Sequence, residues 1–339
     1  MYKHGGDVFE NAVKHDFSIN INPHGMPFEI AEAIKNAVAY ADIYPDYKSR
    51  NLAMLLSKKH EICESQIVIG NGASELIFGV ARMGVKTATV IQPTFSEYKS
   101  CLETAGVEVF DYQMNDSLTF EMADIAKIPM RDVCFICNPN NPTGKLVEVE
   151  VLKSLAIHLE KNGGVLVVDE CFIEFTNGES LDKILNCHPN IIIIRAFTKI
   201  YAMAGVRLGY LLCGSVKNAE KIKKQLPMWN VSHLAQKGGE IAIEKCGDFA
   251  DMLETVEKGR KYLSENLENL GFEVHKSDAN FILFKADFNL KTPLLERGIL
   301  IRDASDFSGL SKNTFRICVS TQDKNEILIN NIKEIIKEI

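Results

Sequence analysis

The sequence has no disulfide framework, no membrane-length apolar run and no apolar leader. Its nine cysteines follow no disulfide-type spacing, and 339 residues are enough to bury a full core without cross-links. The longest apolar run, around residues 191–194, is far shorter than the ~20 residues of a membrane-spanning helix. Residues 1–17 lack the apolar core of a signal peptide. We therefore expect a cytoplasmic protein with no membrane partner.

Basic clusters are scarce as well. The chain has 38 Lys and Arg against 45 Asp and Glu, a net charge of −7, and its densest basic run is Lys221, Lys223 and Lys224. This charge balance argues against nucleic acid as the main partner. With 46% apolar and 24% charged residues, the composition is that of a soluble globular protein and not of a disordered, collagen-like or coiled-coil chain.

The single CxxC motif lies inside an apolar run. Cys134 and Cys137 stand three residues apart in a strand-like segment, where such positions face opposite ways, and no second pair accompanies them. We therefore predict ordinary core cysteines and no metal site.

Short apolar segments alternate with longer helical ones in the middle of the chain. Because the short segments are apolar throughout, they predict a sheet covered by helices on both faces. We expect an α/β domain with a mostly parallel central sheet. The predicted strands are residues 66–70, 87–92, 107–112, 132–137, 164–170, 190–197 and 207–214.

The two ends of the chain differ from this middle part. After Pro227 a long helical stretch, about 232–268, precedes three strand-like runs and a last amphipathic helix from Asp323, which predicts a smaller α+β domain. Residues 1–40 contain too many Gly, Pro and Asn for a regular element. The predicted organisation is an arm that packs with the small domain (1–40), a large domain (41–230) and a small domain (231–339).

Two turns at predicted strand ends carry candidate ligand groups. Residues 70–75 (GNGASE) follow a strand and open a helix, so free backbone NH groups and the helix dipole favour a phosphate there, although a plain tight turn remains an alternative. Residues 137–145 (CNPNNPTGK) form either a rigid amide-lined turn or a Pro-rich connection. Asp169 and Glu170 close a buried strand, where α/β sheets bind ligands, or are simply solvated acids.

Lys199 is the strongest single candidate. It follows an apolar strand and precedes small apolar residues, so a desolvated amine with a lowered pKa is expected, and such an amine can attack a carbonyl carbon. Arg302 and Arg316 lie in apolar strand-like runs and need anions, which structural salt bridges or ligands supply equally well. His4 is uninformative by itself.

Together these segments resemble the fold-type I pyridoxal-phosphate enzymes of the class I/II aminotransferase group. The resemblance implies that fold, this cofactor and a homodimer. The matching motifs, in chain order, are GNGASE, PTFSEY, NPNNPTG, VVDECF, FTK, GVRLGY and FRI.

The resemblance assigns cofactor roles residue by residue. Lys199 is similar to the lysine that binds the cofactor covalently, Asp169 to the acid that pairs with the pyridine nitrogen, and Asn141 to the partner of the ring hydroxyl. Phe95 takes the place of the aromatic side chain that stacks on the ring. The residues implied at the cofactor phosphate are Ala73, Ser74, Thr198 and Arg207, with Tyr44 reaching it from the neighbouring subunit.

Two positions depart from the pattern. Many relatives have Ser or Thr where this chain has Ala196, so one phosphate hydrogen bond should be missing. Aminotransferases commonly have Tyr where this chain has Phe172, which leaves the ring hydroxyl with Asn141 alone. The second change argues for a reaction other than standard amino transfer.

Within the group the sequence most resembles the threonine-phosphate decarboxylases of cobalamin synthesis. It shares the opening HGGD and DFSININPHGMP, the form DECFIEF and the run KQLPMWNVSHLA. The resemblance implies decarboxylation of O-phospho-L-threonine or O-phosphoserine, with substrate contacts from His4, Asn141, Arg302 and Arg316. Histidinol-phosphate aminotransferases share the arginine pair, so amino transfer is the alternative. A binding protein without turnover is the third hypothesis.

Overall fold

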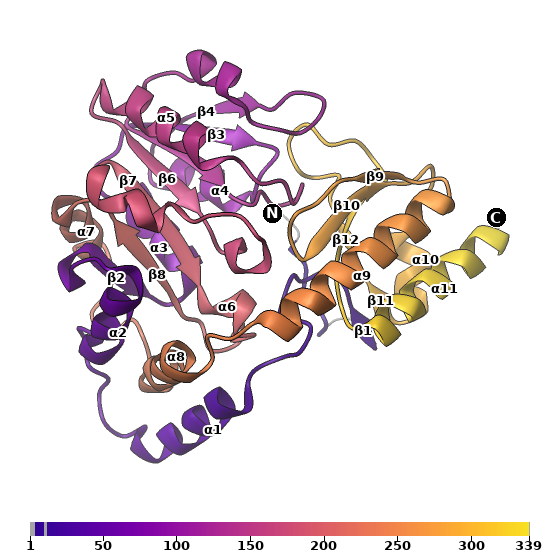
Figure 1. Ribbon diagram of the computed structural model, residues 1–339, viewed down its shortest axis with the longest axis horizontal. Helices are drawn as coiled ribbons and strands as arrows, with labels where there is room; N and C mark the ends of the chain where they lie inside the picture. The colour runs from indigo at the N-terminus through magenta and orange to yellow at the C-terminus, as the bar shows by residue number, and fades with distance from the viewer. Residues whose placement is uncertain (1–3, 10–11, 339) are drawn as a thin grey trace.

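The predicted strands form a seven-stranded sheet in the computed structural model, which describes residues 4–9 and 12–338 (Figure 1). Six strands run in one direction and β8 is antiparallel to both of its neighbours. The predicted mostly parallel sheet is therefore confirmed. In order across the sheet, the strands are β2 (Ile67–Gly70), β8 (Gly209–Cys213), β7 (Ile191–Ala196), β6 (Val165–Asp169), β5 (Val133–Cys137), β3 (Thr87–Gln92) and β4 (Glu108–Gln113).

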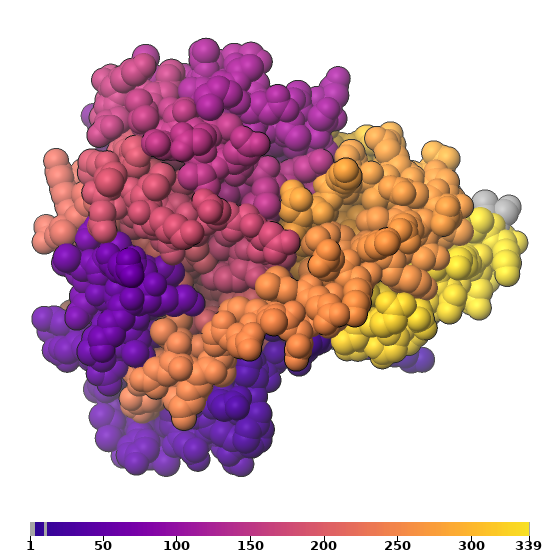
Figure 2. Space-filling model, viewed as in Figure 1, coloured from indigo at the N-terminus to yellow at the C-terminus, as the bar shows by residue number. Residues whose placement is uncertain are grey.

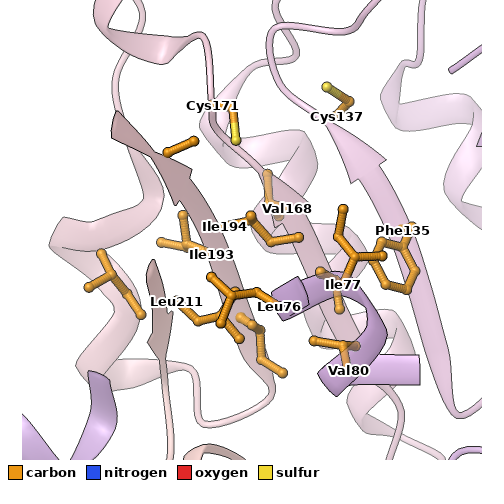
Figure 3. Packing of buried hydrophobic residues seen from close by; sticks show 14 of the residues in the cluster. Leu76, Ile77, Val80, Phe135, Cys137, Val168, Cys171, Ile193, Ile194 and Leu211 are labelled. Atoms are coloured by element: carbon orange, nitrogen blue, oxygen red, sulfur yellow. The ribbon is translucent and has the colours of Figure 1, made fainter. Parts of the chain in front are cut away.

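The central strands are covered on both faces. Every residue of β5, β6, β7 and β8 is buried, which explains why their sequences do not alternate between apolar and polar residues. Helix α3 (Gly72–Ala81) lies on the sheet with Leu76 and Ile77 turned to the strands (Figure 3). Cys134 and Cys137 are core residues of β5, as expected.

The remaining elements of the large lobe are helices and short 3₁₀ turns. The α-helices are α1 (Phe28–Ala37), α2 (Arg50–His60), α4 (Glu97–Thr104), α5 (Val149–Glu160), α6 (Phe197–Ile200), α7 (Val216–Lys223) and α8 (His233–Lys245). The 3₁₀ turns are η1 (Val38–Tyr40), η2 (Glu64–Gln66), η3 (Met122–Lys127), η4 (Ile173–Phe175) and η5 (Leu181–Cys187).

A smaller lobe is built on a four-stranded antiparallel sheet with the order β12-β13-β10-β9. Its buried apolar side chains form a second core, separate from that of the large lobe. The elements of this lobe are β9 (Glu273–His275), β10 (Phe281–Lys285), α10 (Lys291–Glu296), β11 (Ile299–Leu300), β12 (Arg302–Asp303), β13 (Thr314–Cys318) and α11 (Gln322–Glu338).

Helix α9 (Ala250–Asn269) belongs to both lobes. Met252 and Val256 near its start pack in the large core, whereas Leu263 and Leu267 pack in the small one. It crosses the front of the molecule between the lobes (Figure 2). The change of core thus falls later in the chain than the predicted boundary at residue 231.

The predicted arm splits between the two lobes. Strand β1 (His15–Asp16) pairs with β11 and Phe17 enters the small core. The expectation of no regular element over residues 1–40 is wrong for α1, which packs against α8 in the large lobe and buries Ile30. The Gly-, Pro- and Asn-rich sequence ends at Pro27, and good helix formers follow it. Residues 1–3, 10 and 11 lie outside the described residues.

The topology brings the chemically interesting turns to one edge. All strands of the large sheet except β8 end on the same side, and Cys137 at the end of β5 stands opposite Asp169 at the end of β6. In parallel sheets this edge is where ligands bind. No helix in the described part of the chain is long and apolar enough to cross a membrane.

Candidate active site

One cavity of about 240 Å³ opens at this edge between the two lobes. All the site residues expected from the sequence, except Tyr44, line it, although they come from segments spread over the whole chain. These residues are His4, Ala73, Ser74, Phe95, Asn141, Asp169, Thr198, Lys199, Arg207, Arg302 and Arg316.

Lys199 enters the cavity from α6, directly after β7. Burial lowers the pKa of its amine to about 8, and the positive charge of Arg316 adds to the shift. Its Nζ lies 5.7 Å from the ring centroid of Phe172. Since a neutral amine is the nucleophilic form, this lysine is prepared to attack a carbonyl near neutral pH.

Asp169 is held by two donors at the end of β6. The Tyr98 hydroxyl donates to Oδ2 at 2.6 Å and the Cys171 amide donates to Oδ1 at 2.9 Å. Tyr98 is fully buried, and burial together with the negative charge of Asp169 raises its pKa well above the ordinary value. Tyr98 therefore stays protonated as a donor, and the two hydrogen bonds fix the orientation of the Asp169 carboxyl group, which suits a group that faces a ring nitrogen.

The start of α3 forms a cradle for an anion. Gly72 has φ +81°, and a Cβ placed on it would come within 2.5 Å of Nη2 of Arg207. A glycine is therefore needed for the Arg207 guanidinium to approach the backbone before Ala73 and Ser74. A phosphate placed there would meet free NH groups, a helix N-terminus and a cation.

Phe95 and His4 form another wall of the cavity. Their ring centroids are 5.8 Å apart, and His4 Nε2 lies 3.0 Å from Oε1 of Glu97. The ring of Phe95 contacts the edge of Tyr98 at 5.6 Å. The N-terminal segment, the sheet edge and α4 therefore meet at this point.

Arg316 is a buried cation that lacks a carboxylate partner among the described residues. Its guanidinium is bonded to Oδ1 of Asn141 at 2.5 Å and to the carbonyl oxygen of Ser18 at 2.6 Å, while its buried Nε has no partner. Burial and the charge of Arg302 lower its pKa to about 9. The buried Oδ1 of Asn20, which also lines the cavity, is unpaired. Arg316 therefore calls for a ligand with acceptors and a negative charge, and the Asn20 oxygen calls for a donor.

Arg302 has a different environment. Both oxygens of Asp306 accept from its Nη2 at 2.8 Å, and the backbone carbonyl of Asp303 accepts from Nη1. The structure therefore gives Arg302 an internal counter-ion.

Tyr44 lies outside the cavity. Its side chain is exposed, and its ring packs 5.1 Å from that of Trp229. Within one chain the structure does not bring Tyr44 to the other site residues.

Four residues of the site were missed at the sequence level. They are Tyr98, Asn20, Cys171 and Asp306. Tyr98 contacts a distant segment, Cys171 and Asp306 contact residues two and four positions away in turns, and the Asn20 oxygen has no partner. The sequence shows only that Tyr98 ends the PTFSEY motif and that Asn20 stands in the Asn-rich opening. The two residues that depart from the family pattern, Ala196 and Phe172, both line the cavity, and neither side chain carries a hydroxyl group.

An amine, a carboxylate and an anion cradle around one cavity define a site for a phosphorylated cofactor that bears a carbonyl group. The chain belongs to the aminotransferase class I and II family, whose model matches residues 12–332. The cofactor of this family is pyridoxal 5′-phosphate, and the donor set fits it: Lys199 for the carbonyl, Asp169 for the ring nitrogen, and the α3 cradle for the phosphate.

The proteins to which this chain is similar are named for two different activities, decarboxylation and amino transfer. The chain is 30% identical to the threonine-phosphate decarboxylase of Salmonella typhimurium over 99% of this chain and 97% of that protein. It is 31% identical to a histidinol-phosphate aminotransferase of Caldanaerobacter subterraneus over 95% of this chain and 93% of that protein. The crystal structure of the histidinol-phosphate aminotransferase of Clostridium acetobutylicum superimposes with a TM-score of 0.90 at 29% identity, covering 96% of this chain and 100% of that one.

Proposed function

We propose that the protein is a cytoplasmic, pyridoxal-phosphate-dependent decarboxylase of O-phospho-L-threonine or of the similar O-phosphoserine. The observation that supports this most is Arg316, which is buried, lacks a carboxylate partner among the described residues and lines the same cavity as Lys199 and Asp169. A substrate with an additional anionic group gives this cation its missing partner. The product would be an aminoalcohol phosphate for cobalamin synthesis.

The side chains around the cavity select the bond that breaks. When bound, pyridoxal phosphate weakens the bond at the substrate Cα that stands perpendicular to its ring. If Arg316 and Arg302 hold the phosphate, the carboxylate is free to turn into that perpendicular position, so that the Cα–carboxyl bond breaks and CO₂ leaves. The Lys199 amine, or a water molecule, then delivers a proton to Cα.

Phe172 supports the decarboxylase over the aminotransferase. It is buried, with its ring 5.1 Å from Phe281 in an edge-on contact, so it gives the ring hydroxyl no hydrogen bond. Asn141 is left for that role, and Asn141 is already bonded to Arg316. The hydrogen bond between Asn141 and Arg316 therefore joins the residue assigned to the cofactor ring to the residue assigned to the substrate.

The second candidate is amino transfer from histidinol phosphate or another phosphorylated amine. It is favoured by the structural match to the Clostridium acetobutylicum enzyme. In this case Arg316 would hold a phosphate while the Cα hydrogen, and not a carboxylate, stands perpendicular to the ring.

One assay separates these functions. The holoenzyme is incubated with O-phospho-L-threonine without a keto acid, and CO₂ and aminopropanol phosphate are measured. We expect stoichiometric release of both, and loss of both in Lys199→Ala. Conversion of histidinol phosphate that requires 2-oxoglutarate, without CO₂ from phosphothreonine, would instead establish the aminotransferase. Binding without either reaction would identify a protein that carries or senses the ligand.

A further inference from the structure

The two arginines of the cavity lie directly opposite each other on neighbouring strands. Arg302 of β12 is in register with Arg316 of β13, and both are buried. Like charges at such positions repel, and each needs a counter-ion. Arg302 has an ion pair with Asp306, whereas Arg316 has no carboxylate within ion-pair distance among the described residues and is attracted only from farther away by Asp16 and Asp306.

Asp306 is placed so that its side chain can move while the backbone stays. The neighbouring residues Ala304 and Phe307 are anchored in a small apolar cluster with Leu283. The side chain of Asp306 itself is one-third exposed, whereas that of Arg302 is 8% exposed. Rotation of Asp306 into solvent would therefore leave a buried guanidinium open to the cavity, into which Arg302 and Phe307 already project.

We propose that the Asp306 carboxylate is an internal competitor for Arg302, which a ligand anion must displace, and that it thereby keeps the substrate site free of simple anions. An inorganic anion that binds both arginines must displace the Asp306 carboxylate and makes few further contacts in return. A phosphorylated amino acid displaces the same carboxylate but gains additional contacts through its amine and carboxylate. The cost of displacing Asp306 is the same for both ligands, so inorganic phosphate, which gains little else, binds weakly, whereas a complete substrate still binds through its additional contacts.

This inference rests on the proposed phosphorylated substrate, but not on which bond of it breaks. The probe is inorganic phosphate, titrated calorimetrically into the holoenzyme at constant ionic strength. We expect Asp306→Asn to lower the dissociation constant of phosphate about tenfold, the range of one charged hydrogen bond. In kinetic terms the variant becomes strongly inhibited by phosphate.

Three control variants separate this role from a structural one. Asp306→Glu should restore the affinity of the natural protein. Asp303→Asn removes the same charge from the end of β12, next to this loop, without releasing the Arg302 guanidinium from its carboxylate, and should change phosphate binding less than twofold. In an Arg302→Gln background, Asp306→Asn should have a much smaller effect, because only the longer-range attraction between Asp306 and Arg316 is then lost.

The direction in which Asp306→Asn changes the phosphate affinity distinguishes a competing carboxylate from a structural one. A residue that only holds the loop would weaken phosphate binding, or leave it unchanged, when it is replaced. Unchanged or weaker binding in Asp306→Asn, an absence of binding in both proteins, or an effect of the same size without Arg302 would overturn the proposal. The CO₂ assay is independent of this result, because an aminotransferase with the same anion site would show the same phosphate effect.

Discussion

At the scale of single residues, the contact between Tyr98 and Asp169 is the most informative. One donor is bound to each carboxylate oxygen, so the orientation of Asp169 is fixed. The ring nitrogen of the cofactor would share this carboxylate with Tyr98. Tyr98 is therefore a positioning residue rather than a catalytic one.

We expect Tyr98→Phe to weaken retention of pyridoxal phosphate by about tenfold, since a hydrogen bond to a charged acceptor contributes about 1.5 to 3 kcal/mol. Equilibrium dialysis gives the affinity, and the absorbance of the bound cofactor should change its pH dependence. The matched control is Tyr112→Phe, because the Tyr112 hydroxyl donates to Asp124 in the same way at 2.7 Å, away from the cavity. Equal cofactor affinity in both variants would contradict the assignment.

Lys199 leads to a prediction about pH. Its amine has a pKa near 8, so the neutral form grows from a minor to the major species as the pH rises from 7 to 9. The rate at which the apoprotein recombines with pyridoxal phosphate should therefore increase over this range, with a midpoint near 8. Stopped-flow absorbance measures that rate. A midpoint near the ordinary lysine value, above pH 10, would show that burial does not activate this amine.

At the scale of elements, the sequence predicted strands better than the N-terminal segment. Strands such as β6 and β7 consist of unbroken apolar residues, so burial on both faces leaves a clear pattern. Residues 1–40 were predicted as one irregular arm from their average composition. That average concealed the helical sequence of α1, which lies next to Gly- and Pro-rich residues.

At the site, too, the sequence predicted some residues and not others. Residues of the turns after β2, β6 and β7 were predictable, because strand ends and family motifs mark them. The Tyr98–Asp169 bond joins residues 71 positions apart, and no local pattern records it. The pairing of Asp306 with Arg302 spans only four positions, but it depends on the shape of the loop between β12 and β13.

At the scale of the whole molecule, an exposed aromatic surface on the large lobe is a candidate interface between two copies of the chain. Large apolar side chains gather there, at Tyr40, Ile43, Tyr44, Met228 and Trp229. Patches of this kind mark protein interfaces. We propose a symmetric dimer in which Tyr44 of each subunit serves the site of the other.

This proposal predicts that the active species is a dimer and that Tyr44→Phe weakens cofactor retention about threefold to tenfold, as expected for about 0.5 to 1.5 kcal/mol from a neutral hydrogen bond. Sedimentation at assay concentration gives the oligomeric state, and dialysis gives the affinity. Tyr47→Phe is the control, because Tyr47 is also exposed nearby but is not assigned to the site. A fully active monomer would refute the shared site.

Helix α9, with one end in each core, has a mechanical consequence. A 20-residue helix is a rod about 30 Å long, so a tilt of about 10° at one end carries the other end through about 5 Å. A repacking around Met252 and Val256 that tilted this rod would be magnified at its other end, which packs against the small sheet that bears Arg316. The width of the cleft would then depend on side chains that do not line it.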